Sequence, residues 1–128
     1  MKTFVAFILF AGSAAADVIP VPSGQVVEFA DLIMDAEGEV EETWRFRFIA
    51  PGIARDGGTI DTETAFVDMQ ALCDAFIAPA LARKGVAPGQ VIVSLSDRPV
   101  EFGQANPEAT QFFEAFALRD GKCEWEGF

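Results

Sequence analysis

The feature that most constrains this fold is a single amphipathic helical stripe in an otherwise β-rich chain. Between Thr62 and Lys84 the apolar residues recur every three or four positions, which is the spacing of one helix face. The stripe comprises Phe66, Met69, Leu72, Cys73, Phe76 and Ala80. A stripe of this kind is buried in a core, so the helix requires a sheet to pack against.

Both ends of this helix carry recognisable signals. Asp61 or Thr62 can act as the N-cap, and Glu63 suits the first turn. A basic last turn precedes Gly85, a typical C-terminal residue. Pro79 predicts that the helix ends or kinks at the residue before it.

The remainder of the chain alternates β-forming runs with turn residues. Five runs are predicted strands: 25–35, 43–51, 90–98, 111–118 and 122–128. The first two form a hairpin, the last two form a hairpin around residues 119–121, and residues 99–110 are irregular. Strands with one helix predict an α+β fold, an antiparallel sheet of about five strands in the order β-β-α-β-β-β with the helix on one face.

Residues 1–16 have the pattern of a secretory signal peptide. Lys2 gives a basic start, an apolar run follows, and Ala14 and Ala16 occupy the small positions before a cleavage site. The run is shorter than the roughly 20 residues needed to cross a bilayer. We therefore expect cleavage after Ala16 rather than a membrane anchor, which leaves residues 17–128 as one exported domain that does not insert into the membrane.

The charge balance narrows the range of partners. The chain has 20 acidic and 9 basic residues and a net charge of −11. This excludes nucleic acid and anionic lipid surfaces, which attract basic faces. Acidity of this kind keeps a secreted protein soluble and monomeric, so we expect a monomer. The five acids within residues 35–42 indicate a solvated loop rather than a cation site, because like charges repel.

Cys73 and Cys123 are the two cysteines of a chain bound for an oxidising compartment. Redox pairs commonly lie two residues apart, and the chain has no histidine to complete a zinc site. We therefore predict a structural disulfide that joins the helix to the last strand. Closing a loop of about 50 residues stabilises the fold by about 4 kcal/mol.

The residue types restrict the possible chemistry. Without histidine or tyrosine the chain has no Ser-His-Asp triad and no imidazole base, and it contains no P-loop or dinucleotide motif. No cofactor or metal is predicted. The remaining enzymatic option is a carboxylate pair, Asp97 and Glu101, with Arg98 between them.

This polar cluster follows a predicted strand, where such side chains commonly bond the neighbouring backbone. We favour a structural clasp at Asp97 over a catalytic role. The preferred function is therefore a non-enzymatic binding module, and the alternative is a small carboxylate-dependent hydrolase that uses Asp97 and Glu101.

Arg45 and Arg47 share the face of their strand opposite to an aromatic face of Trp44, Phe46 and Phe48. The arginines form either a cross-strand ion-pair ladder or an anion-binding patch. We favour the ladder, because carboxylates are in excess. The candidate interaction site comprises Arg45, Arg47, Asp97, Arg98 and Glu101.

Several segments of the sequence resemble a known family. They are "RFRFIAP", "VDMQALC", "VSLSDRPVEFG", "ATQFFEAF" and "GKCEWEGF". Together they are similar to a set of small exported alphaproteobacterial proteins classed as a domain of unknown function. The resemblance implies a bacterial periplasmic setting and supplies no activity or catalytic residues. The expected partner is a protein or a small ligand in the periplasm.

Overall fold

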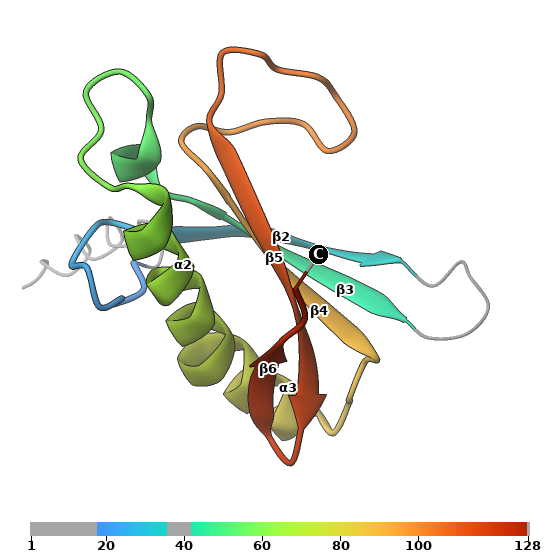
Figure 1. The fold of residues 1–128 in the computed structure, drawn as a ribbon. Coiled ribbons are helices and arrows are strands. Elements are labelled where there is room, and N and C mark those ends of the chain that lie inside the picture. The colour runs from blue at the N-terminus through green and yellow to red at the C-terminus, as the bar shows by residue number, and fades with distance from the viewer. Residues whose placement is uncertain (1–17, 36–41, 128) are drawn as a thin grey trace, which may run out of the picture.

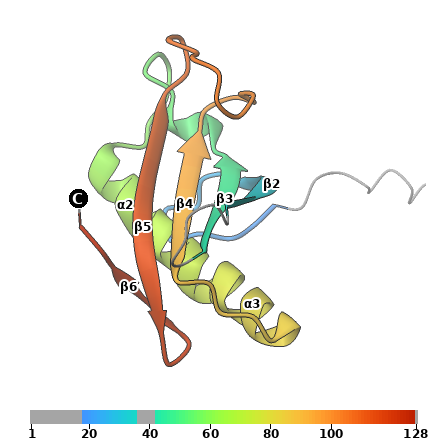
Figure 2. The same cartoon turned by 90° about the vertical axis from the view of Figure 1, so that its right-hand side faces the viewer.

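A five-stranded sheet with one long helix forms the protein. The computed structural model describes residues 18–35 and 42–127, so the predicted signal peptide and residues 36–41 of the acidic loop lie outside the described residues. The strands, in their order across the sheet, are β2 (Glu28–Asp35), β3 (Thr43–Ile49), β4 (Gln90–Ser96), β5 (Gln111–Arg119) and β6 (Lys122–Trp125). The helix lies across one face (Figures 1 and 2), which confirms the predicted α+β class and element order.

The sheet is mixed, whereas the sequence predicted an antiparallel one. Strands β3 and β4 run parallel, with Thr43 opposite Gln90 and Ile49 opposite Ser96, and the other neighbouring pairs are antiparallel. The helix connects β3 to β4, and by crossing the sheet it returns the chain to the end where β3 began. The next strand therefore starts in the same direction as β3.

The helix has three consecutive parts: α2 (Thr62–Ala71), the π-helical segment η2 (Leu72–Ile77) and α3 (Ala78–Lys84). It begins as predicted, because the Thr64 N–H donates to the Asp61 carboxylate at 2.9 Å. Among the described residues, this is the one helix long and apolar enough to cross a membrane by length and composition, and 44% of its apolar window is buried within the fold.

The helix continues through Pro79 instead of ending before it. The irregularity falls in the preceding turn, where the Ala78 N–H bonds to the Cys73 carbonyl five residues back. Proline lacks an N–H and its ring crowds the carbonyl four residues earlier, so a wider turn accommodates it.

The core lies between the helix and the sheet face that it covers. Large side chains that are fully buried there include Phe48, Met69, Leu72, Ile77, Val91, Val93, Leu95 and Phe116. Burial of each such side chain stabilises the fold by about 1.5–3 kcal/mol.

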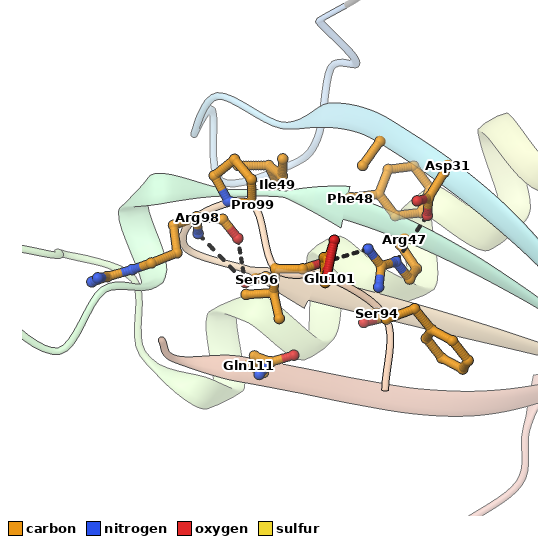
Figure 3. A pocket seen from close by; sticks show the side chains of 13 residues that line it. Asp31, Arg47, Phe48, Ile49, Ser94, Ser96, Arg98, Pro99, Glu101 and Gln111 are labelled. Carbon is orange, nitrogen blue, oxygen red and sulfur yellow. Dashed lines mark hydrogen bonds and ion pairs between the residues drawn. The ribbon is translucent and has the colours of Figure 1, made fainter. Parts of the chain in front are cut away.

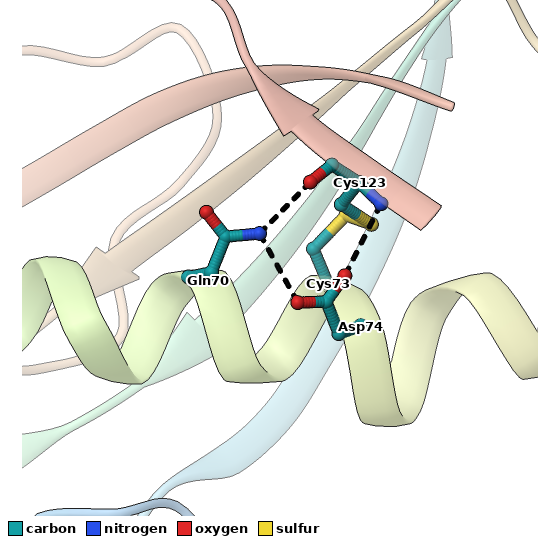
Figure 4. The surroundings of a disulfide bond; sticks show 4 residues. All are labelled: Gln70, Cys73, Asp74 and Cys123. Carbon is teal, nitrogen blue, oxygen red and sulfur yellow. Dashed lines mark hydrogen bonds between the residues drawn. A yellow bond between two sulfur atoms is a disulfide. The ribbon is translucent and has the colours of Figure 1, made fainter. Parts of the chain in front are cut away.

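The predicted disulfide is confirmed. It joins Cys73 of η2 to Cys123 of β6, and both residues are buried (Figure 4). Around it the Gln70 amide donates to the Cys123 carbonyl at 2.9 Å, and the Cys123 N–H donates to the Asp74 carboxylate at 3.1 Å. These bonds attach the last strand to the helix.

A buried carboxylate attaches the N-terminal segment to the helix. Asp68 of α2 has an exposed fraction of 0%. It accepts hydrogen bonds from the Ser23 N–H at 3.0 Å, the Ser23 hydroxyl at 2.6 Å and the Gln25 amide at 2.8 Å. These three donors replace water around a carboxylate that forms no ion pair with any of the described basic residues, and they hold residues 18–27 in place.

Candidate functional site

The sheet face away from the helix carries the candidate site, and a β-bulge determines which side chains reach it. Phe29 lies opposite Phe48, but Asp31 lies opposite Arg47, so Ala30 is an extra residue in β2. Phe29 therefore packs toward the helix, with its ring 5.8 Å from that of Phe76, whereas Asp31 points to the open face. In a regular strand these two residues would share a face.

Arg47 connects this open face to the loop that lies over it. Its Nε donates to Asp31 Oδ1 at 2.8 Å, and its Nη2 donates to the Val100 carbonyl at 2.7 Å. Its side chain is 16% exposed. Arg47 thus makes the cross-strand pair of the ladder hypothesis and also positions the loop.

Arg45 has different surroundings. Its guanidinium lies 5.5 Å from the centre of the Phe102 ring, and that of Arg47 lies 5.6 Å from the same ring. Within residues 18–35 and 42–127, no carboxylate lies within ion-pair distance of Arg45. No described carboxylate therefore neutralises the charge of Arg45.

Residues 98–109, here called the open-face loop, leave and re-enter the sheet through a closed neck. The Asp97 N–H donates to the Thr110 carbonyl, and the Thr110 N–H donates to Asp97 Oδ1, both at 3.0 Å. Arg98 donates to the two Asp97 oxygens from Nε and Nη2 at 3.2 and 3.1 Å. Ser96 Oγ adds a bond to the Arg98 carbonyl at 2.6 Å.

The hydrogen bonds at the neck indicate a structural role for Asp97. The Arg98 guanidinium, followed by the Thr110 N–H, lowers the pKa of Asp97, and its side chain is only 3% exposed. A carboxyl group with a lowered pKa is a poor general acid, and Asp97 does not line either cavity described below. The geometry therefore places Asp97 in a structural clasp.

Two adjoining cavities lie between the open face and the loop, and Figure 3 shows the residues that line the larger one. The larger has a volume of about 440 Å³ and the smaller about 240 Å³. Six residues line both: Arg47, Ser94, Val100, Glu101, Phe102 and Gln111. Asp31 and Arg98 line only the larger cavity, whereas Arg45 and Phe113 line only the smaller one.

Several lining groups have unused bonding capacity. In the part of the chain that the structure describes, the side chains of Ser94, Glu101 and Gln111 make no hydrogen bond or ion pair. They come from β4, the open-face loop and β5, so three separate elements present a hydroxyl, a carboxylate and an amide to one region. Such convergent polar groups beside apolar walls are typical of small-molecule sites.

The structure brings together some of the predicted site residues and separates others. Arg45, Arg47 and Glu101 line the smaller cavity, Arg98 lines the larger one with its guanidinium turned away, and Asp97 closes the neck. The sequence did not indicate Asp31, because the bulge that turns it is a local irregularity. Ser94, Phe102 and Gln111 were also missed, although an aromatic residue beside Gly103 in an irregular segment was a visible signal.

The sequence model of a protein family, described as a family of unknown function (DUF6497), matches residues 6–128. No curated protein and no solved structure matches the chain.

Proposed function

The chain belongs to this family of unknown function, and since membership supplies no activity, we propose that the protein is a non-enzymatic module that binds a small ligand in the cavities of its open face. We further propose that it is exported and acts in the periplasm as a monomer. The export proposal rests on the signal-peptide pattern of residues 1–16.

One observation carries the binding proposal. A loop held at its neck by the Asp97 clasp, and fastened to the sheet by Arg47, covers cavities in whose lining the side chains of Ser94, Glu101 and Gln111 make no hydrogen bond or ion pair to another described residue. The larger cavity, at about 440 Å³, is within the range of about 300–1,000 Å³ for ligand pockets. A pre-formed loop lowers the entropy that binding must remove.

A direct test is NMR shift mapping of the purified protein with a library of small metabolites. We expect at least one compound to move the amide signals of Ser94, Phe102 and Gln111 together. Gln111 and Ser94 line both cavities, so Gln111→Trp and Ser94→Trp, which each add a bulky ring there, should weaken binding strongly.

A matched control is Val67→Trp, because Val67 is exposed on the helix side of the molecule. This substitution should leave binding unchanged. Shifts confined to the helix or to residues 119–125 would refute the open-face site, and so would a wild-type Kd in both Gln111→Trp and Ser94→Trp.

Export has a separate test in mass spectrometry of the protein recovered from cell fractions. We expect a periplasmic chain that begins at Asp17 and is two hydrogen atoms lighter than its reduced form, because of the disulfide. A cytoplasmic chain that retains Met1 would refute the export proposal.

A further inference from the structure

We propose that the smaller cavity recognises a zwitterion with an apolar side chain, which is the chemistry of a free apolar amino acid. This inference rests on the proposed binding function and adds the ligand class. It is argued from the charged side chains of the open face that form no ion pair with another described residue.

The positive charge of the site is that of Arg45. The chain has 20 acidic and 9 basic residues, so an arginine without a carboxylate partner is unexpected, yet Arg45 has none among the described residues. Its guanidinium rests on the Phe102 ring, which limits its motion. The planar fork of a guanidinium matches a ligand carboxylate with two parallel hydrogen bonds.

The negative charge of the site is that of Glu101, which lines the same cavity from the loop. The other two charges nearby cancel, because Arg47 and Asp31 form an ion pair at 2.8 Å. Among the described residues that line the smaller cavity, one cation and one anion are therefore left for a ligand. A purely anionic ligand would meet repulsion from Glu101, whereas a zwitterion would satisfy both groups.

The apolar part of the ligand has two rings to contact. Phe102 and Phe113 line the cavity and are 53% and 55% exposed. Aromatic rings of this size contribute apolar area and also stack on other rings. At about 240 Å³ the cavity lies below the range for drug-sized ligands, which suits a molecule as small as one amino acid.

The test uses four probes that share one side chain and whose termini carry different charges, because each terminus is either free or capped. They are phenylalanine, which is a zwitterion, N-acetylphenylalanine, which is an anion, phenylalanine amide, which is a cation, and N-acetylphenylalanine amide, which is neutral. Kd values are measured from NMR titrations that follow the amides of Ser94, Phe102 and Gln111. We expect phenylalanine to bind about 10- to 100-fold more tightly than the neutral probe, the range for a hydrogen bond to a charged group.

Two variants separate the two charges. Arg45→Gln should raise the Kd of phenylalanine by about 10-fold or more. It should also abolish the preference for probes that have a free carboxylate. Glu101→Gln should remove the preference for the ligand ammonium, so that N-acetylphenylalanine binds as well as phenylalanine. The matched controls are Arg119→Gln and Glu124→Gln, which break an exposed ion pair on the β5–β6 hairpin and should change no Kd.

The outcomes separate this inference from the proposed function. Equal binding of all four probes, or an unchanged charge preference in both site variants, would refute the zwitterion site. The zwitterion site would also be refuted if phenylalanine did not shift the three amides while a library compound of another charge class did. That result would still support ligand binding in the open-face cavities. If neither the probes nor the library moves these amides, both proposals fail.

Discussion

The helix side and the open face of the sheet use the same kinds of side chains in opposite ways. On the helix side, the buried Asp68 accepts three hydrogen bonds, and the last strand is held by a disulfide and by Asp74. On the open face, Arg45 and Glu101 have no ion-pair partner among the described residues. Charged groups thus fix the fold on both sides, but only on the open face are two described cavity-lining charges, Arg45 and Glu101, left for the ligand that we propose.

Two carboxylates in one short segment differ in the same way. Asp97 and Glu101 are four residues apart, yet Asp97 is enclosed in the neck of the open-face loop and Glu101 lines both cavities. A buried carboxylate must be fully bonded, because an unmade bond in the interior is costly. An exposed one carries no such requirement and can bond to a ligand.

The largest effect expected on the helix side is loss of the disulfide. The double variant Cys73→Ala, Cys123→Ala should lower the free energy of unfolding by about 2–5 kcal/mol, because the unfolded chain regains the freedom of a 50-residue loop. Urea denaturation measures this. Wild type under reducing conditions is the control and should behave like the variant.

If the two sides are separate in function, the disulfide variant should still bind ligand in the open-face cavities wherever it remains folded. If the folded variant no longer showed ligand-induced shifts at the cavity amides, the two sides would be coupled rather than separate.

A smaller effect is expected at Asp68. Replacement by alanine leaves Ser23 and Gln25 without their acceptor and should cost about 1–3 kcal/mol. Hydrogen exchange should accelerate in residues 18–27 and not in the open-face loop. Asp68→Asn, which keeps one acceptor oxygen, should cost less, and an equal cost for both variants would argue against the hydrogen bonds as the cause.

At Asp97 the expected effect depends on pH. The pKa of Asp97 is lowered in the folded state from an ordinary value of 3.8. Its ionised form therefore stabilises the fold above about pH 3.8, and this contribution is lost as the pH falls through the lower folded-state pKa. Asp97→Asn should cost about 1.5 kcal/mol near neutral pH, the scale of a hydrogen bond to a charged group.

The urea-denaturation curves of wild type and Asp97→Asn should thus converge as the solution becomes acidic. If the difference in unfolding free energy between the two proteins grew toward low pH, the ionised form of Asp97 would not be the stabilising one. Thermal melts of the same two proteins provide a second measurement.

The two strand arginines should show the smallest effects on stability, and they should differ from each other. Arg47→Gln removes the Asp31 pair and the bond to Val100, so we expect a loss of about 1 kcal/mol and faster hydrogen exchange in the open-face loop. Arg45→Gln should stay within about 0.5 kcal/mol of wild type, as for a surface change. Equal losses for both variants would show that Arg45 is structural.

The sequence by itself determined what depends on near neighbours in the chain. Asp61 and Thr64 are three residues apart, so the helix cap was predictable. The last hairpin turns at Asp120 and Gly121, both with positive φ, which suits a residue pair of this type. The disulfide was predictable because only two cysteines exist. In each case the physical cause lies within a few residues or has one possible partner.

Only the tertiary structure decided what depends on contacts between distant segments. Asp68 meets Ser23 across 45 positions, and Arg47 meets Val100 across 53. The parallel pairing of β3 with β4, the bulge at Ala30 and the position of the open-face loop likewise arise from packing against elements far along the chain. The spacing of apolar residues shows which face of a helix or strand a residue occupies, but it does not show which element packs on that face. Long-range pairing depends on how whole elements bury their apolar surfaces together.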